Sequence, residues 1–143
     1  MIRLKKIIME EQEFIEMYQK SFQDHDTPLP MNVYHIYDDD EIIAFCSVNI
    51  ESRGTLYLQY VGFLKEVEGH KKYKYFVETI AGLHKLGYPY ISGAIHNRNI
   101  VALIWALRSG FIIYGIRGDT RGDIYVQVLH EHEEVLRWQV GKD

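Results

Sequence analysis

Two runs of charged residues carry side chains of the kind that bind ions. The run 70–74 (HKKYK) places three lysines and a histidine at the start of an expected helix. Ammonium groups bind phosphates well, and cations in a first turn oppose the helix dipole. The run therefore favours a phosphate site, with a solvated first turn as the alternative. The second run, 38–41 (DDDE), would suit a cationic amine, although a charged hairpin tip is the simpler interpretation.

The histidines and the cysteine are the other reactive side chains. His96 has an imidazole whose ordinary pKa, about 6.5, suits a general base; the alternative is a loop histidine bonded to nearby backbone. His130 and His132 would point the same way on a strand, but two such ligands seldom make a metal site, so no metal is predicted. Cys46 is the only cysteine, which excludes an internal disulfide, and its apolar neighbours predict a buried, inert thiol.

The elements that must position these residues follow from hydrophobic periodicity and turn residues. The predicted strands span 2–8, 33–37, 42–50, 56–63, 90–95, 111–116 and 124–129. The predicted helices span 10–22, 69–87 and 100–107. The last helix is apolar nearly all round and is therefore expected to be buried, with Asn97 or Asn99 as its cap.

The element order is therefore β-α-β-β-β-α-β-α-β-β. The strand–helix–strand unit in its middle requires a parallel pair, because a crossover helix returns the chain in the same direction. The flanking hairpins are antiparallel. This predicts an α/β (mixed α+β) fold with a central mixed sheet of about seven strands and helices on both faces, in one domain over 1–143 with a tail over 131–143.

Charge and hydropathy exclude several classes of function. The chain has 143 residues with 16 basic and 20 acidic side chains, a net charge of −4. No global basic field attracts nucleic acid or anionic lipid. The longest apolar run, 100–107, is far shorter than the ~20 residues that a membrane span needs, and no targeting segment is recognised. We expect a cytoplasmic protein with neither a nucleic-acid nor a membrane partner.

One segment, together with the element order, resembles a known superfamily. Residues 99–111 (NIVALIWALRSGF) contain Asn99, an alanine three positions on at Ala102, and a terminal Gly110-Phe111. This is similar to the fourth-helix pattern of the GNAT superfamily of acyl-coenzyme A N-acyltransferases, and the resemblance extends from about Ile2 to Leu129. It implies that the fourth and fifth strands part, so that the pantetheine arm of acetyl-CoA bonds to free backbone groups.

The resemblance also implies a coenzyme site, with the pyrophosphate at the N-terminus of the helix that starts near Gly69. The residues it implies for acetyl-CoA are Phe63, Leu64, Glu68, Gly69, His70, Lys71, Lys72, Tyr73, Asn99, Ala102 and Trp105. The loop departs from the superfamily's Gln/Arg-x-x-Gly-x-Gly/Ala pattern, because residues 68–73 read EGHKKY and keep one glycine. Many GNAT enzymes have a proton-donating tyrosine where this chain has Ala106.

The implied activity is transfer of an acetyl group from acetyl-CoA, a co-substrate, to a primary amine by direct attack. The implied catalytic residues are His96, Tyr57, Gln59 and Tyr60. The amine would belong to a small molecule or a peptide. The alternative is a GNAT-fold binding or structural protein that has lost the coenzyme loop. Phe111, Ile113 and Tyr125 on the last hairpin predict a homodimer contact at a sheet edge.

Overall fold

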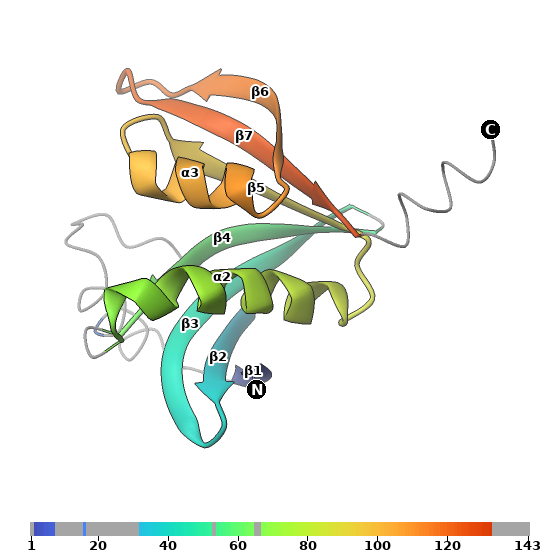
Figure 1. Cartoon of the computed structure of the whole chain (residues 1–143). Helices are drawn as coiled ribbons and strands as arrows, with labels where there is room; N and C mark the ends of the chain where they lie inside the picture. Colours follow the sequence, from blue (N-terminus) through green and yellow to red (C-terminus); the bar gives the residue numbers. More distant parts are fainter. Residues whose placement is uncertain (1, 8–15, 17–31, 53, 65–66, 133–143) are drawn as a thin grey trace. The chain divides into compact units, whose positions relative to one another are not determined.

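The structure is a computed structural model, and it describes residues 2–7, 16, 32–52, 54–64 and 67–132. The predicted helix over 10–22 and the predicted tail beyond residue 132 lie outside the described residues. The elements of the described part are β1 (Ile2–Ile7), β2 (Asn32–Asp38), β3 (Glu41–Ser52), β4 (Thr55–Phe63), α2 (Gly69–His84), β5 (Tyr90–His96), α3 (Ile100–Arg108), β6 (Ile112–Gly118) and β7 (Ile124–Glu131) (Figure 1).

The strands form one sheet in the order β1-β2-β3-β4-β5-β7-β6. The pairs β1–β2, β2–β3, β5–β7 and β6–β7 are antiparallel. The neighbours β4 and β5 are joined through α2, the crossover that requires a parallel pair. The prediction of a mixed seven-stranded sheet is thus confirmed. The charged hairpin is also confirmed, with a tight turn in which Asp39 takes φ 53°, a conformation that aspartate tolerates.

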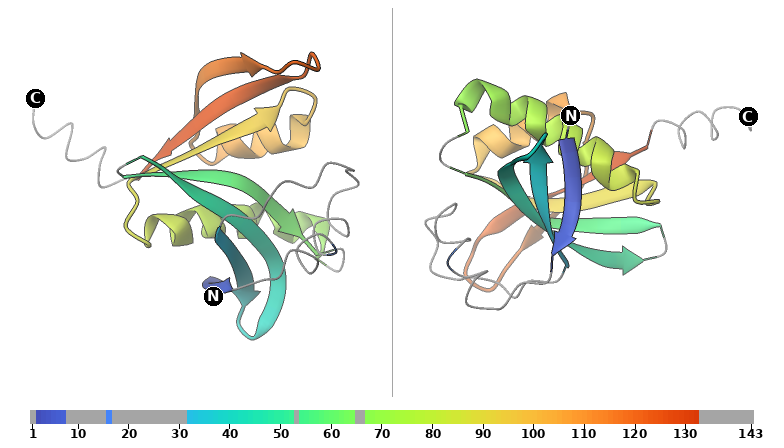
Figure 2. Two further views of the ribbon diagram at one scale, coloured as in Figure 1. Left: turned by 180° about the vertical axis from the view of Figure 1, so that it is seen from behind. Right: turned by 90° about the horizontal axis from the view of Figure 1, so that it is seen from below.

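The described chain divides into two compact units, and each is considered by itself. The first consists of Met1–Asn49 and Leu58–Gly82. Here α2 lies on one face of the strands (Figures 1 and 2). A Cβ atom on Gly82 would lie 2.7 Å from Leu4 Cδ1, so a larger residue here would require the Leu4 side chain of β1 to move. The hydroxyl of buried Tyr75 donates to Asp38 Oδ2 at 2.6 Å, which ties α2 to the β2–β3 turn.

The second unit consists of Ile50–Tyr57 and Leu83–Asp143. In it, α3 covers one face of the β5, β7 and β6 strands (Figures 1 and 2). The apolar side chains that are less than a tenth exposed in this unit are Leu56, Leu83, Ile91, Ala106, Phe111 and Val128.

The prediction that the helix over 100–107 is buried all round is wrong. Ala106 is the one fully buried residue of α3, at 1% exposure. A helix that packs on one face of a sheet touches it with one side only, so apolar residues on its other side face outward. Those residues are about half exposed: Ile100, Val101, Ile104 and Leu107.

The last hairpin also differs from the prediction in one residue. Ile113 is 51% exposed on β6, the terminal strand of the order, as a contact surface requires. Phe111 is only 5% exposed, because its ring packs against His130 with 4.9 Å between ring centroids. Phe111 is therefore part of the core, and the predicted homodimer contact loses this residue.

Candidate functional site

The N-terminal end of α2 is an open structure. A backbone hydrogen bond from Leu64 N to Ile43 O, 3.1 Å, fixes the chain just after β4. The helix then begins at Gly69, where an added Cβ would meet no atom within 4 Å. The first N–H groups of a helix have no partner inside it, and together with the dipole they favour an anion. Gly69 is exposed, so a ligand can reach its backbone, whereas the N–H of Lys71 already donates to Glu68 O at 3.0 Å.

The charges around this helix end are mainly positive. The first turn contains no acidic residue. Exposed Lys71 and half-buried Lys72 make no ion pair with another described residue, whereas Lys74 lies 3.7 Å from Glu78 one turn further on. The carboxylate of Glu68 is 3.2 Å from His70 Nε2. The two lysines are thus the cations that an anionic ligand would meet here.

Two of the predicted catalytic residues lie on the β4 segment of the first unit. Gln59 Oε1 accepts a 2.7 Å hydrogen bond from the hydroxyl of Ser47, a residue with no exposed surface. The hydroxyl oxygen of Tyr60 is buried. Both polar ends are therefore turned toward protein, and their catalytic role stays a prediction. Sequence reasoning missed Ser47, which reads as an ordinary strand residue.

In the second unit, α3 has the predicted N-cap. Asn99 Oδ1 accepts from the backbone N–H of Ala102 at 3.2 Å. The helix ends at Arg108 with Ser109 as its C-cap, and Gly110 just beyond takes φ 101°, a value that favours glycine. Ala102 and Trp105 are half-buried. The polar end of Asn99 is therefore occupied by the helix it caps.

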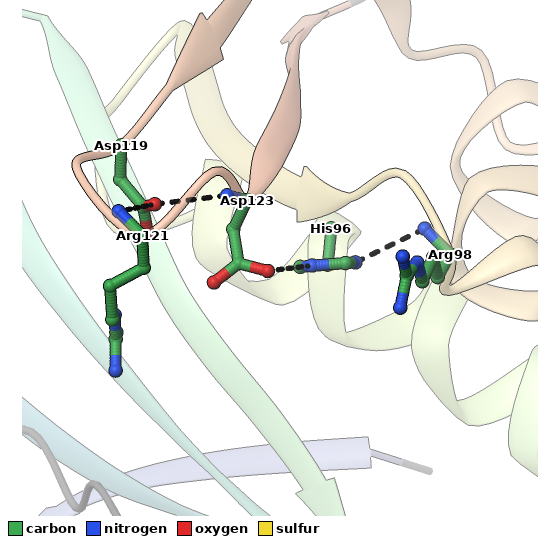
Figure 3. Close-up of polar contacts among 5 residues, drawn as sticks. All are labelled: His96, Arg98, Asp119, Arg121 and Asp123. Carbon is green, nitrogen blue, oxygen red and sulfur yellow. Dashed lines mark hydrogen bonds and ion pairs between the residues drawn. The ribbon is translucent and has the colours of Figure 1, made fainter.

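His96 lies at the end of β5 and bonds to the β6–β7 loop (Figure 3). Its Nε2 donates to Asp123 Oδ1 at 2.9 Å, and its Nδ1 accepts from the backbone N–H of Arg98 at 3.1 Å. A backbone N–H only donates, so Nδ1 is the bare nitrogen and Nε2 carries the proton. Both ring nitrogens are engaged, and a general base at Nδ1 must first release Arg98.

Asp123 is held in place by its own loop. Asp119 Oδ1 accepts from the backbone N–H of Asp123 at 3.0 Å and from that of Arg121 at 2.9 Å (Figure 3). The hydrogen bond from His96 is the main cause that lowers the pKa of Asp123, and nearby arginine charges add to it. The carboxylate is therefore ionised near neutral pH and fixes the tautomer of His96. No local sequence pattern marks this partner, which is 27 residues away from His96.

A second carboxylate of this unit, Glu51, accepts a hydrogen bond from β5. Ser92, 1% exposed on β5, donates to Glu51 Oε2 at 2.7 Å, and Glu51 itself is exposed. Burial is the main cause that raises the pKa of Tyr114, and the charges of Glu51 and Tyr57 add to it. The fourth predicted catalytic residue, Tyr57, lies on β4 and is half-buried. Sequence reasoning did not select Glu51.

The predicted residues thus fall into two sets. The first unit holds Gln59, Tyr60, Phe63, Leu64, Glu68, Gly69, His70, Lys71, Lys72 and Tyr73; the second holds Tyr57, His96, Asn99, Ala102 and Trp105. In the described part of the chain, no three His, Cys, Asp or Glu side chains are grouped as a metal site would require.

Comparison with known proteins gives a clear result for the fold. No family model matches the sequence, and no curated protein matches it. Solved structures do match. An acetyltransferase from Bacillus subtilis in complex with CoA aligns over 92% of this chain and 99% of its own, with TM-score 0.71 and 14% identity.

Two further structures agree. A GNAT family acetyltransferase from Elizabethkingia anophelis with acetyl-CoA bound aligns over 92% of this chain and 98% of its own, with TM-score 0.65 and 12% identity. The ribosomal-protein-S18-alanine N-acetyltransferase from Escherichia coli aligns over 92% and 94%, with TM-score 0.64 and 13% identity. The chain has the fold of the GNAT acetyltransferases. Neither described helix is both long and apolar enough for a membrane span.

Proposed function

We propose that this protein is an N-acetyltransferase that uses acetyl-CoA and transfers the acetyl group to a primary amine. The observation that carries the proposal is the match over 92% of the chain to an acetyltransferase in complex with CoA. The open, cation-bearing start of α2 supports it, because an anionic coenzyme needs such a place.

For the coenzyme, each set of residues has a proposed role. The backbone after β4, at Phe63 and Leu64, pairs with the pantetheine arm as an added strand would. The pyrophosphate lies at the N-terminus of α2, with Lys71 and Lys72 replacing by charge the glycines that the loop lacks. The carboxylate of Glu68 lies 3.2 Å from His70 Nε2, so it has a partner of its own in this turn. Ala102 and Trp105 of α3 complete the proposed set.

For the acceptor, the second unit offers a carboxylate. An ammonium-bearing substrate would bind at exposed Glu51 and must lose a proton before it attacks the thioester carbonyl. Tyr57 keeps its proposed catalytic role, while His96 acts as base only after it releases Arg98. The leaving thiolate takes its proton from water or from a side chain other than Ala106.

The first test measures coenzyme binding. A thermal-shift titration with acetyl-CoA should raise the midpoint by several degrees, since a ligand at a hundred times its Kd adds about 2.7 kcal/mol. The variant Lys71→Glu with Lys72→Glu should lose this shift. The matched control is Lys85→Glu, an exposed lysine just past the other end of α2, which should keep it.

The second test separates an enzyme from a binding protein. Release of free CoA thiol is followed with a set of polyamines and peptides. Turnover that falls at least tenfold in Glu51→Gln, with coenzyme binding unchanged, supports the enzyme. Binding without turnover for any amine would favour the non-catalytic alternative. No shift at millimolar acetyl-CoA in the unmodified protein would overturn the proposal.

A further inference from the structure

A buried and a half-buried histidine of the second unit, His84 and His130, form a continuous series of hydrogen bonds between two backbone carbonyls. His84 Nδ1 is 2.8 Å from the carbonyl oxygen of Tyr88, and His84 Nε2 is 2.8 Å from His130 Nδ1. His130 Nε2 is in turn 3.0 Å from the carbonyl oxygen of Ser109. His84 is only 7% exposed. The two histidines thus make three contacts at hydrogen-bond distance, one with each carbonyl and one with each other.

Counting protons gives a definite charge for this pair. A carbonyl oxygen only accepts, so each of the two carbonyl contacts needs an N–H from its imidazole. The contact between the rings needs a third proton, because two bare nitrogens at 2.8 Å would face each other with their lone pairs. Two neutral imidazoles carry two N–H protons. We infer that His84 and His130 share one additional proton and act as a single buried cation that joins α2 to β7 and to the end of α3.

The surroundings of the pair stabilise a positive charge. His84 is the last residue of α2, and Ser109 is the C-cap of α3. Two helices therefore direct the negative ends of their dipoles at the pair, which favours a cation. The ring of Phe111 packs on His130 and brings no charge. Among the described residues, the titratable group that faces the pair is His132 of β7, whose ring centroid is 5.1 Å from that of His84.

The inference assigns a role to residues that the candidate active site does not use. Gly110 and Phe111, the last residues of the 99–111 motif, lie next to His130. A Cβ atom on Gly110 would lie 3.4 Å from His130 Nε2. The proton therefore acts as a clamp at the C-terminal ends of α2 and α3. It makes the rigidity of these ends dependent on pH.

The direction of that pH dependence follows from the two protonation steps of a coupled pair. Burial is the main cause that lowers the pKa of His84 and of His130; the charge of His132 adds to it in both, and the charge of His130 adds to it in His84. The charge of one ring on the other opposes the step that would give both rings a charge. Burial opposes the first extra proton as well, but the contact between the rings requires that proton and the ends of two helices favour it, so in the proposed pair its pKa lies above the ordinary value.

The folded protein is therefore most stable between these two steps. Above the ordinary imidazole pKa, about 6.5, the unfolded chain has released the proton that the folded pair still holds. This stabilisation is complete below that value and is lost as pH rises through the raised pKa. At acid pH the unfolded chain binds a second extra proton that the folded pair does not bind, so the free energy of unfolding falls there too.

The direct test is nitrogen NMR of the imidazoles in the unmodified protein at pH 7.5. A free histidine is then roughly 90% neutral. The pair should show three protonated positions among four ring nitrogens, with the shared proton between His84 Nε2 and His130 Nδ1. Two fully bare nitrogens, one in each ring, would overturn the inference whatever the behaviour of any variant.

The second test follows the unfolding equilibrium from pH 7 to pH 9 in the unmodified protein, His84→Gln and His130→Gln. The unmodified protein should lose up to tenfold in the folding equilibrium constant per pH unit over the range in which the folded pair holds the shared proton and the unfolded chain has released it, and both variants should lack this loss. Burial raises the pKa of Cys46 to about 12, which adds an alkaline loss common to all of them. His70→Gln, at an exposed histidine, is the control and should behave like the unmodified protein. Equal slopes in all four proteins would contradict the clamp.

Discussion

The two ends of α2 carry cationic or protonatable groups under opposite conditions. At the first turn, Lys71 is exposed, and its charge opposes the helix dipole. At the last residue, His84 is buried, and a positive charge there agrees with the dipole. The same kind of charge therefore weakens one end of the helix and strengthens the other. A positive charge at Lys71, where the helix dipole disfavours it, is the stronger indication of a ligand. A positive charge at His84 is favoured by the dipole, so its structural role is sufficient to explain it.

The largest effect is expected from removing the packing at the buried end. Leu83 has no exposed surface, so Leu83→Ala should lower the free energy of unfolding by about 2–5 kcal/mol, as measured by urea denaturation. Leu86→Ala, at a residue 44% exposed nearby, should change it by less than about 0.5 kcal/mol. Equal effects of the two variants would mean that this end is not packed as described.

A smaller effect is expected at the start of α3, whose N-terminus is closed by its own side chain. Asn99→Ala removes the acceptor for the Ala102 N–H and should cost about 1 kcal/mol, as measured by thermal unfolding. Asn99→Asp, which supplies an equally good cap, should restore the stability. If the aspartate variant is as weak as the alanine variant, the role of Asn99 is not capping.

The smallest effect has the opposite sign. Lys71→Glu replaces a cation with an anion at the first turn of α2 and should raise stability by a few tenths of a kcal/mol. Lys85→Glu, beyond the other end of the helix, should lower it by a similar amount. Both changes are read from chemical denaturation at low salt, where the dipole effect is least screened. A destabilised Lys71→Glu would show that the lysine supports the fold rather than a ligand.

Sequence patterns predicted those features that depend on neighbouring residues. The Asn99 cap and the charged β2–β3 turn are each set within about four residues, and both are confirmed. The end of the second helix, predicted at Gly87, falls three residues earlier, at His84. The sheet class followed from the order of elements. The sequence correctly predicted an apolar helix at α3, but it did not show which side of that helix would pack on the sheet.

The partners of the site residues could not be predicted, because they depend on strand register. His96 meets Asp123 only because β5 pairs with β7 so that His96 lies opposite Tyr125. Ser92 reaches Glu51 from 41 residues away. The contact of His84 with His130 likewise joins the end of a helix to a strand 46 residues on. No local signal marks such pairs, although each residue type was visible in the sequence.

The exposed terminal strand β6 has a practical consequence for work with the protein. Ile116 is 73% exposed there, and Ile112 and Ile113 are each more than half exposed. Edge strands of natural sheets commonly carry lysine or proline, which prevents pairing with another chain. On β6 the one charged side chain is that of Arg117. In concentrated samples, aggregation through intermolecular strand pairing should therefore begin at β6. The substitution Ile116→Lys should reduce this aggregation.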